Sequence, residues 1–128
     1  MIMEYRSGLL FTEIEIVFKN KSKIINNIVI DTGASKTLIS QDSVEDIDIR
    51  INKNDPVITS YGIGGEEHAF VKTVDSIILG DYSFKECQLD FARINYSDIN
   101  GLLGLDLLIG AGVMLDLNKL KCYALKSK

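Results

Sequence analysis

Apolar and polar residues alternate with a period of two in several short stretches of the chain, which is the pattern of β-strands that bury one face. Glutamates alternate with isoleucine and phenylalanine over residues 13–18, a polar turn follows over residues 19–23, and residues 24–30 are again mostly apolar. We therefore expect a hairpin near the start of the chain, with its second strand ending at Ile30.

Comparable stretches continue to the end of the chain. Residues 41–46 are polar and can form one short helical turn, and residues 106–109 leave room for one or two turns of helix. We expect the remaining strands over residues 57–61, 69–74, 76–79, 82–91, 100–104, 113–117 and 120–125. Many short strands with close turns and almost no helix predict one compact all-β domain over residues 1–128, a barrel or a sandwich.

The composition narrows the possible functions. The 128 residues are 46% hydrophobic and 25% charged, as in ordinary soluble globular proteins. The net charge of -4 and the lack of a basic cluster interleaved with aromatic residues argue against a nucleic-acid partner. The sequence shows no signal peptide and no apolar stretch of membrane length, so we expect a cytoplasmic protein with no membrane partner. Cys87 and Cys122 are then expected to be small buried residues with free thiols.

A carboxylate interrupts the most apolar part of the chain. The apolar residues 28–30 run directly into Asp31, Thr32 and Gly33, and the chain becomes apolar again at residues 38–39. An ionised group between two strands that favour the interior is unfavourable unless it is paired or hydrogen-bonded. Asp31 is therefore the leading candidate for a chemically active residue, although an Asp-Thr-Gly turn alone is also typical of ordinary loops.

Three motifs in the same order resemble those of the retropepsin-like aspartic proteases. Residues 31–35, Asp-Thr-Gly-Ala-Ser, resemble the active-site loop of that family. Residues 61–65, Tyr-Gly-Ile-Gly-Gly, resemble its flap, a glycine-rich hairpin that closes over bound substrate. Residues 101–104, Gly-Leu-Leu-Gly, resemble the strand that passes beneath the catalytic loop and leads into a helix. The resemblance implies the closed acid-protease barrel with one short C-terminal helix, in a single-domain member of the bacterial type.

The resemblance also implies roles for individual residues. Asp31, Thr32 and Gly33 would form the catalytic loop. The residues that would bind substrate are Ala34, Ser35, Tyr61, Gly62, Ile63, Gly64, Gly65 and Leu103. The glycines would give the hairpin its flexibility, and Ile63 would provide an apolar contact. No cofactor and no metal are implied.

Hydrolysis of a peptide by carboxylates needs two of them, one ionised to accept a proton from water and one protonated to donate to the developing oxyanion. The sequence contains one Asp-Thr-Gly. We therefore expect a homodimer in which Asp31 of each subunit meets its counterpart at a two-fold axis. The partner molecule would be an extended peptide or protein substrate, bound in the manner of an added strand and with apolar side chains preferred. Residues 4–11 and 120–125 are candidates for the rest of the interface.

Two positions depart from the pattern of the family. Ala34 stands where many pepsin-like enzymes have a serine, and without that hydroxyl the charged form of the aspartate pair is less favoured, so we expect a mildly acidic optimum. Ser35 and Leu105 stand where retroviral members carry an aspartate and an arginine that pair with each other. Because both partners are absent together, no charge is left without its partner.

Two other functions are compatible with the sequence. The chain could be a catalytically silent module that binds peptides or dimerises on the same fold, and a strict monomer would favour that hypothesis. A hydrolase or metal site that combines Asp31 with His68 is the other alternative. His68 follows two glutamates on what should be a solvated arm of the hairpin, where a lone histidine is usually a surface residue.

Overall fold

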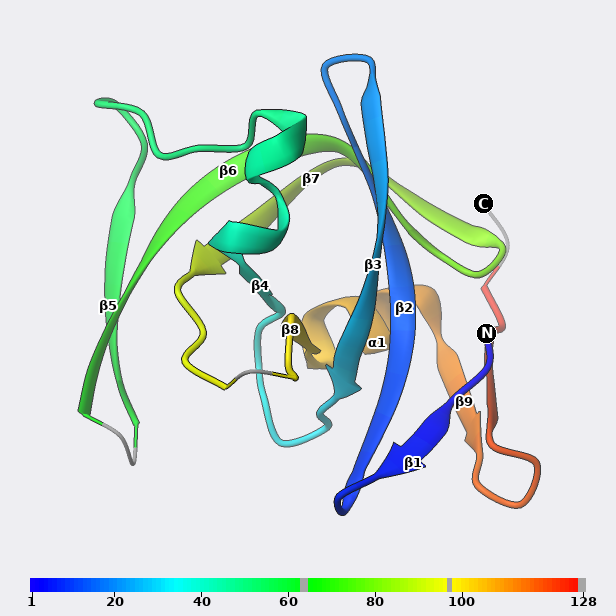
Figure 1. Cartoon of the computed structure of the whole chain (residues 1–128). Coiled ribbons are helices and arrows are strands. Elements are labelled where there is room, and N and C mark those ends of the chain that lie inside the picture. The colour runs from blue at the N-terminus through cyan, green and yellow to red at the C-terminus, as the bar shows by residue number, and fades with distance from the viewer. Residues whose placement is uncertain (63–64, 97, 127–128) are drawn as a thin grey trace.

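Strands dominate the computed structural model, which describes residues 1–62, 65–96 and 98–126 (Figure 1). The strands are β1 (Glu4–Arg6), β2 (Leu9–Phe18), β3 (Lys21–Ile30), β4 (Leu38–Ser40), β5 (Val57–Gly62), β6 (Gly65–Leu79), β7 (Tyr82–Ala92), β8 (Gly101–Leu103), β9 (Val113–Asp116) and β10 (Lys121–Ala124). The helices are two short 3-10 turns, η1 (Gln41–Ser43) and η2 (Glu45–Ile47), and the α-helix α1 (Leu105–Ala111). The expected all-β class with one short helix near the C-terminus is confirmed.

The strand pairings close into a ring. The large sheet has the order β1-β2-β3-β8-β4-β7-β6-β5, and β2 pairs in addition with β6. This extra pairing joins β2, β3, β8, β4, β7 and β6 into a closed circle of hydrogen-bonded neighbours, with β1 and β5 attached outside it. The sequence predicts a closed barrel, and these pairings define one.

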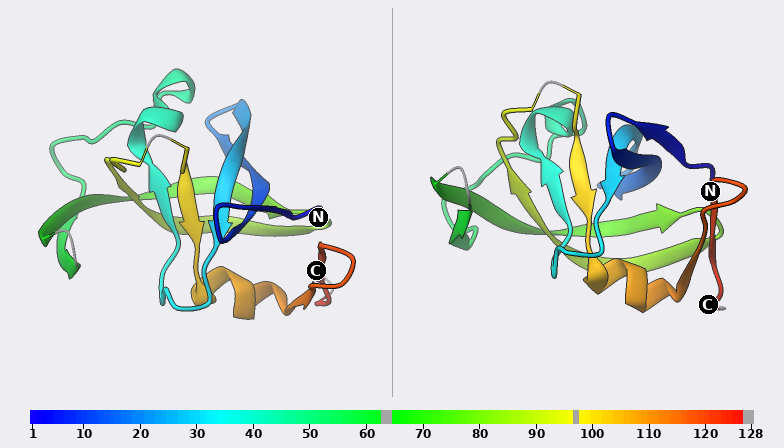
Figure 2. Two further views of the ribbon diagram at one scale, coloured as in Figure 1. Left: turned by 60° about the horizontal axis from the view of Figure 1, so that its bottom comes forward. Right: turned by 90° about the horizontal axis from the view of Figure 1, so that it is seen from below.

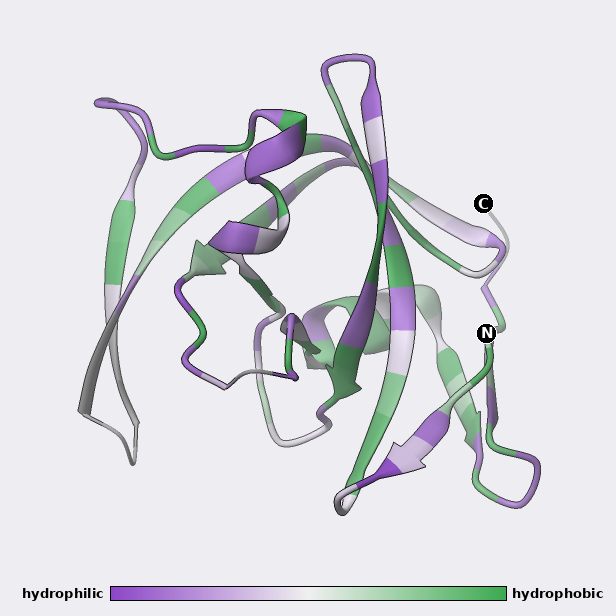
Figure 3. Cartoon of the chain, viewed as in Figure 1, coloured by the Kyte–Doolittle hydropathy of each residue, from purple (hydrophilic) through white to green (hydrophobic). Residues whose placement is uncertain are grey.

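The first hairpin brings the chain to the middle of the ring. Its two-residue turn, Lys19 and Asn20, has positive φ at both positions, as tight hairpin turns require. The last residues of β3 pair in parallel with β8, with Ile28 opposite Gly101 and Ile30 opposite Leu103. Figure 3 shows that this end of β3 is hydrophobic, whereas the turn at the far end of the hairpin is hydrophilic. The end of β3 is therefore held in the core just before Asp31.

β6 differs from its prediction. The sequence predicts separate strands over residues 69–74 and 76–79, but β6 runs unbroken from Gly65 to Leu79. Asp75, at the predicted break, is exposed, and its carboxylate accepts a hydrogen bond from the backbone N–H of Lys19 at 3.0 Å. An outward-facing aspartate does not interrupt a strand that has partners on both sides. Ser76 to Ile78 of β6 pair with β2, so the same strand also closes the ring.

The central strands have two faces that differ in character. Residues opposite one another on neighbouring strands share a face. The face that belongs to the hydrophobic core carries Ile28, Ile30, Leu103, Ile39, Leu89, Phe91 and Phe70. Helix α1 adds Leu107, Leu108 and Ala111 to the same cluster of buried residues. The opposite face carries a row of residues outside that cluster, which we call the outer row: Val29, Leu102, Leu38, Asp90 and Val71.

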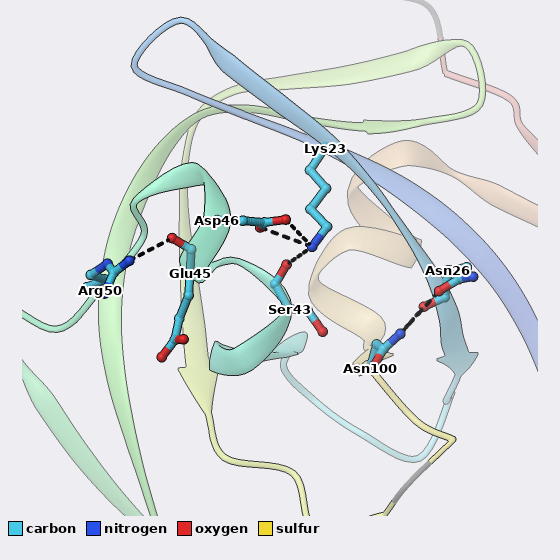
Figure 4. Close-up of polar contacts among 7 residues, drawn as sticks. All are labelled: Lys23, Asn26, Ser43, Glu45, Asp46, Arg50 and Asn100. Atoms are coloured by element: carbon cyan, nitrogen blue, oxygen red, sulfur yellow. Dashed lines mark hydrogen bonds and ion pairs between the residues drawn. The ribbon is translucent and has the colours of Figure 1, made fainter.

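Polar contacts attach the 3-10 turns to β3 (Figure 4). The ammonium of Lys23 donates to the carbonyl of Ser43 at 2.7 Å and to the carboxylate of Asp46 at 2.8 Å. This hydrogen bond from Lys23 holds the pKa of the Asp46 carboxyl below its usual value. A separate contact lies farther along β3, where the side-chain amide of Asn100 donates to the carbonyl of Asn26 at 3.0 Å. The segment over residues 41–47 is thereby fixed at one end of the ring, and it forms two short 3-10 turns where the sequence predicts one.

The N-terminal segment and the C-terminal hairpin lie side by side (Figure 2). β9 and β10 form an antiparallel hairpin, and the first residues of the chain run along β10. The backbone N–H of Met3 donates to the carbonyl of Leu120, and that of Cys122 donates to the carbonyl of Met1, both at 2.9 Å. Both thiols are free, and Cys122 is buried as predicted, whereas Cys87 is only half-buried.

Candidate active site

Asp31 begins the loop that connects β3 to β4, residues 31–37. Its backbone N–H donates to the carbonyl of Leu103 at 3.0 Å, which continues the pairing of β3 with β8 by one residue. Its side-chain Oδ1 accepts a hydrogen bond from the backbone N–H of Gly33 at 2.9 Å. Asp31 as a residue is half-buried, and this hydrogen bond of its carboxylate is exposed. The loop therefore holds this side chain in one orientation without enclosing it.

Gly33 makes a close approach to the side chain of Asp31. A Cβ atom at position 33 would lie 3.2 Å from Oδ1 of Asp31, which is tighter than ordinary van der Waals contact. The absence of a side chain lets the backbone N–H of residue 33 approach the carboxylate. Ala34 completes the turn, because its N–H donates to the backbone carbonyl of Asp31 at 3.1 Å.

Gly104 lies directly against the backbone of the loop. A Cβ atom there would lie 2.6 Å from the carbonyl carbon of Lys36 and 2.9 Å from the carbonyl oxygen of Ala34. The N–H of Leu105 donates to that same oxygen of Ala34 at 2.8 Å. The junction of β8 and α1 thus supports the loop through backbone contacts that leave no room for a side chain at position 104.

Thr37 and Asp106 form a polar contact that the sequence did not predict. The hydroxyl of Thr37 donates to Oδ1 of Asp106 at 2.8 Å and accepts a hydrogen bond from the N–H of Gly104 at 3.0 Å. The N–H of Thr37 donates to both carboxylate oxygens, at 3.0 and 3.1 Å. Thr37 is only 1% exposed. The available signal was its spacing, because Thr37 shares the core-facing side with Ile39, where a polar side chain needs a partner.

The structure brings several of the predicted site residues together. Thr32 and Gly33 are exposed beside Asp31, and on the same loop Ala34 is half-buried and Ser35 is exposed. In Figure 1 this loop and the hairpin of β5 and β6 lie toward the same side of the molecule.

The hairpin of β5 and β6, which we call the arm, lies where the sequence predicts the glycine-rich hairpin. Tyr61 and Gly62 end β5, Gly65 begins β6, and Gly62 pairs with Gly65. Ile63 and Gly64 lie outside the described residues. The described part of the arm therefore lies at the predicted position in the sequence.

Leu103 is placed differently from the other predicted substrate-binding residues. It is 1% exposed and belongs to the hydrophobic core. Its neighbour Leu102 is half-exposed and lies in the outer row, because successive residues of a strand face opposite sides. The residue of β8 that the structure places on the face away from the core is thus Leu102, one position before the predicted Leu103.

His68 lies on the arm. Its Nδ1 is 3.1 Å from the hydroxyl of Thr59 on the neighbouring strand. Within the described ranges, no group of three or more His, Cys, Asp or Glu residues is arranged to hold a metal ion. The geometry therefore offers no support for a site built on Asp31 and His68.

An apolar pocket of about 410 Å³ adjoins the loop at Thr32. Its other lining residues come from α1, from β9 and from the C-terminal segment: Leu105, Leu108, Ile109, Gly112, Val113, Leu115 and Lys126. Ile109 is 65% exposed at the edge of this pocket. The loop that carries the carboxylate is thus bordered by an uncovered apolar surface.

An oriented carboxylate after a buried strand, a glycine-rich hairpin on the same side and a supporting Gly-Leu-Leu-Gly strand define an acid-protease type of site. Comparison with family models agrees, because the model of the aspartyl protease family matches residues 15–107. The chain belongs to the aspartyl protease family. The expected enzyme class, an aspartic endopeptidase, is thereby confirmed.

Solved structures show the same fold. A retropepsin-like aspartic protease from Rickettsia conorii matches with a TM-score of 0.66 and 21% sequence identity, over 90% of this chain and 82% of that one. EIAV protease, in complex with the inhibitor HBY-793, matches with a TM-score of 0.63 and 22% identity, over 89% of this chain and 99% of that one. The retropepsin-like fold is therefore confirmed. A comparison with curated protein sequences found no match.

None of the helices in the described ranges has the length and apolar character of a membrane span.

Proposed function

We propose that the chain is an aspartic endopeptidase that works as a homodimer, with one Asp31 contributed by each subunit. The observation that carries this proposal is the oriented carboxylate of the half-buried Asp31, in a chain that contains one Asp-Thr-Gly. A single carboxylate can act as an acid or as a base, but it cannot act as both at the same moment. A two-fold axis beside the loop supplies the second one, and all of residues 1–128 act as one domain in this arrangement.

The reaction follows from the pair. Two carboxyl groups in close contact share one proton, because both cannot ionise together. The ionised carboxylate accepts a proton from a water molecule while the oxygen of that water attacks the carbon of the peptide carbonyl. At the same time the protonated carboxyl donates its proton to the carbonyl oxygen. When the tetrahedral intermediate collapses, one of its hydroxyl groups gives its proton to the carboxylate that is now ionised. The other carboxyl, which took its proton from the water, donates that proton to the peptide nitrogen as the C–N bond breaks. The pair then again holds one proton.

The contacts within the loop support this chemistry. The N–H of Gly33 orients the Asp31 carboxylate at 2.9 Å, so little reorganisation is needed when the carboxylate reacts. Thr32 is exposed at the position where the partner subunit's loop would approach. In the dimer, Thr32 would contact its counterpart across the axis and lock the two loops together.

The uncovered apolar surface beside Thr32 indicates where the second subunit would bind. Residues of α1, β9, β10 and their flanking segments that expose large apolar side chains are Ile109, Met114, Leu117, Tyr123 and Leu125. Of the two segments predicted as the interface, residues 4–6 form β1 and pair with β2, whereas residues 120–125 include the exposed Tyr123 and Leu125. We therefore place the contact with the second subunit on the surface around the 410 Å³ pocket, next to the loop.

The substrate would be an extended peptide held between the two Asp31 loops and the arms. Main-chain hydrogen bonds of the added-strand type would bind it, and closure of the arms would exclude water. Ala34, Ser35 and Leu102 would contact its side chains, together with residues 61–65 of the arm. The free thiols of Cys87 and Cys122 are consistent with a reducing compartment, so we place the enzyme in the cytoplasm.

The test combines cleavage with solution mass. Wild type is incubated with a peptide library, alongside Asp31→Asn and a control, Asp81→Asn, which removes an exposed carboxylate at the β6–β7 turn. We expect Asp31→Asn to lose at least about a thousandfold of the activity, Asp81→Asn to retain it, and sedimentation to give the mass of a dimer. A strict monomer that binds peptides without cutting them would overturn the proposal and leave the silent binding module.

A further inference from the structure

Asp90 is a buried acidic residue of β7 that lies among apolar neighbours. It lies in the outer row between Leu38 of β4 and Val71 of β6, and it is 7% exposed. Among the described residues, none forms a hydrogen bond or an ion pair with its carboxylate. Its oxygens are not among the fully enclosed polar atoms, so they reach the surface. A buried acid without a partner is unfavourable, which indicates that it serves something other than stability.

The outer row connects the two parts of the proposed active site. Val29 lies two residues before Asp31, and Leu38 follows the loop directly. At the other end of the row, Val71 belongs to β6, the strand that continues into the arm. In the proposed function, a peptide held between Asp31 and the arm would pass over this row. Asp90 is the acidic member of a row that is otherwise apolar.

The charges around Asp90 leave it available to a ligand. Burial raises the pKa of the Asp90 carboxyl, and the charge of Asp106 adds to this rise, while the positive charge of Lys36 opposes it. Lys36 is exposed on the loop and, among the described residues, it forms no ion pair with Asp90. The charge of Lys36 therefore acts on the carboxylate of Asp90 without direct contact between the two groups. A second cation in direct contact would hold the carboxylate in its charged form.

We propose that Asp90 makes one substrate subsite select a lysine or arginine side chain. This inference rests on the proposed function and makes it more specific. In the homodimer the two Asp90 carboxylates are related by the same axis as the two Asp31 carboxylates. The preference for a basic residue is thus expected at two positions that lie equally far from the scissile bond, one on each side, with apolar preferences elsewhere.

The experiment compares matched peptides that differ at one position only. Each peptide carries Lys, Arg, Leu or Gln at the position under test, and kcat/KM is measured for wild type, Asp90→Asn and the control Asp81→Asn. We expect wild type and the control to prefer Lys or Arg over Leu by about tenfold or more, since hydrogen-bonded charge pairs are worth at least that factor. In Asp90→Asn this preference is lost, while cleavage of the Leu peptide is retained.

A second variant and a binding measurement keep the two proposals separable. Lys36→Gln removes the competing cation, so the preference for Lys or Arg should increase. The inactive Asp31→Asn protein should bind the Lys peptide more tightly than the Leu peptide, as measured by fluorescence anisotropy. Cleavage by wild type with equal preference for Lys and Leu, or an unchanged preference in Asp90→Asn, would overturn the role of Asp90 alone. No cleavage of any peptide by wild type would overturn both proposals.

Discussion

The hydroxyl of Thr37 donates to the carboxylate of Asp106 at 2.8 Å and accepts the N–H of Gly104 at 3.0 Å, so one buried side chain connects the end of the Asp31 loop to the start of α1. The contact joins residues that are 69 positions apart in the sequence. Both ends of the loop are then fixed, because the N–H of Asp31 donates to Leu103 at the other end. The orientation of the Asp31 carboxylate depends on this frame.

Thr37→Val keeps the shape of the side chain and removes both hydrogen bonds of the hydroxyl. The buried N–H of Gly104 is left without a partner, so we expect the free energy of unfolding to fall by about 1–3 kcal/mol. Urea unfolding measures this loss. Thr73→Val, at an exposed position of β6, serves as the control and should change stability little. Equal stability of Thr37→Val and wild type would contradict the role given to Thr37.

The two glycines of the site predict opposite phenotypes when each is changed to alanine. Gly104→Ala brings a Cβ within 2.6 Å of backbone, which cannot move aside, so we expect a loss of stability of about 3 kcal/mol or a failure to fold. Gly33→Ala brings a Cβ within 3.2 Å of the Asp31 side chain, so the protein should fold but lose most of its cleavage activity. Circular dichroism together with peptide cleavage separates the two. A stable, active Gly104→Ala protein would refute this account of the loop.

Asp90→Asn should stabilise the fold at neutral pH. The pKa of the Asp90 carboxyl is raised above its ordinary 3.8, so its ionisation opposes folding. That penalty is absent below the ordinary value and develops as the pH rises through the raised one. Thermal unfolding at pH 7 and pH 3 should therefore show a higher Tm for the variant at pH 7 and a smaller difference at pH 3. A variant that is less stable than wild type at pH 7 would contradict the direction of the pKa.

Ala34→Ser tests the expected pH optimum. A serine hydroxyl beside the aspartate pair can donate to its charged form, which favours ionisation at lower pH. The acid limb of the cleavage profile should therefore move to lower pH in Ala34→Ser. The measurement is kcat/KM as a function of pH for both proteins, and coincident acid limbs would count against the hypothesis.

Ile109→Glu tests the proposed interface. A charge in place of this 65% exposed isoleucine should weaken dimerisation at least about a hundredfold and reduce activity in proportion at low concentration. Ile24→Glu, at a 60% exposed isoleucine of β3, is the matched control. Analytical ultracentrifugation measures both. If Ile109→Glu remains a fully active dimer, the contact lies elsewhere.

Local patterns predicted most of the strands, because alternation and turn residues act over a few positions. The hairpin of β2 and β3, the arm, β8 and the helix after it all lie where the sequence indicates. The contacts that depend on distant partners were not predictable in this way. The pairing of β2 with β6 closes the ring only once both strands exist, and it explains why β6 continues past Asp75.

The candidate site was predicted unevenly for the same reason. The motif around Asp31 is continuous in sequence and was found, whereas Thr37 meets Asp106 only through the fold. The difference between Leu102 and Leu103 depends on which face of β8 meets the core, and three residues are too few for alternation to show it. Asp90 is embedded in an apolar stretch of β7, and only the register with Leu38 and Val71 reveals what lies beside it.

One strand, β6, both closes the barrel and extends into the arm. Its fifteen residues form one continuous strand with a length along the backbone of about 50 Å. If the arm closes over substrate as proposed, selection for heat resistance and selection for peptide turnover act on the same piece of backbone. Loosening the pairing of β6 with β2 would disturb the barrel and the arm together, because one continuous strand forms part of both.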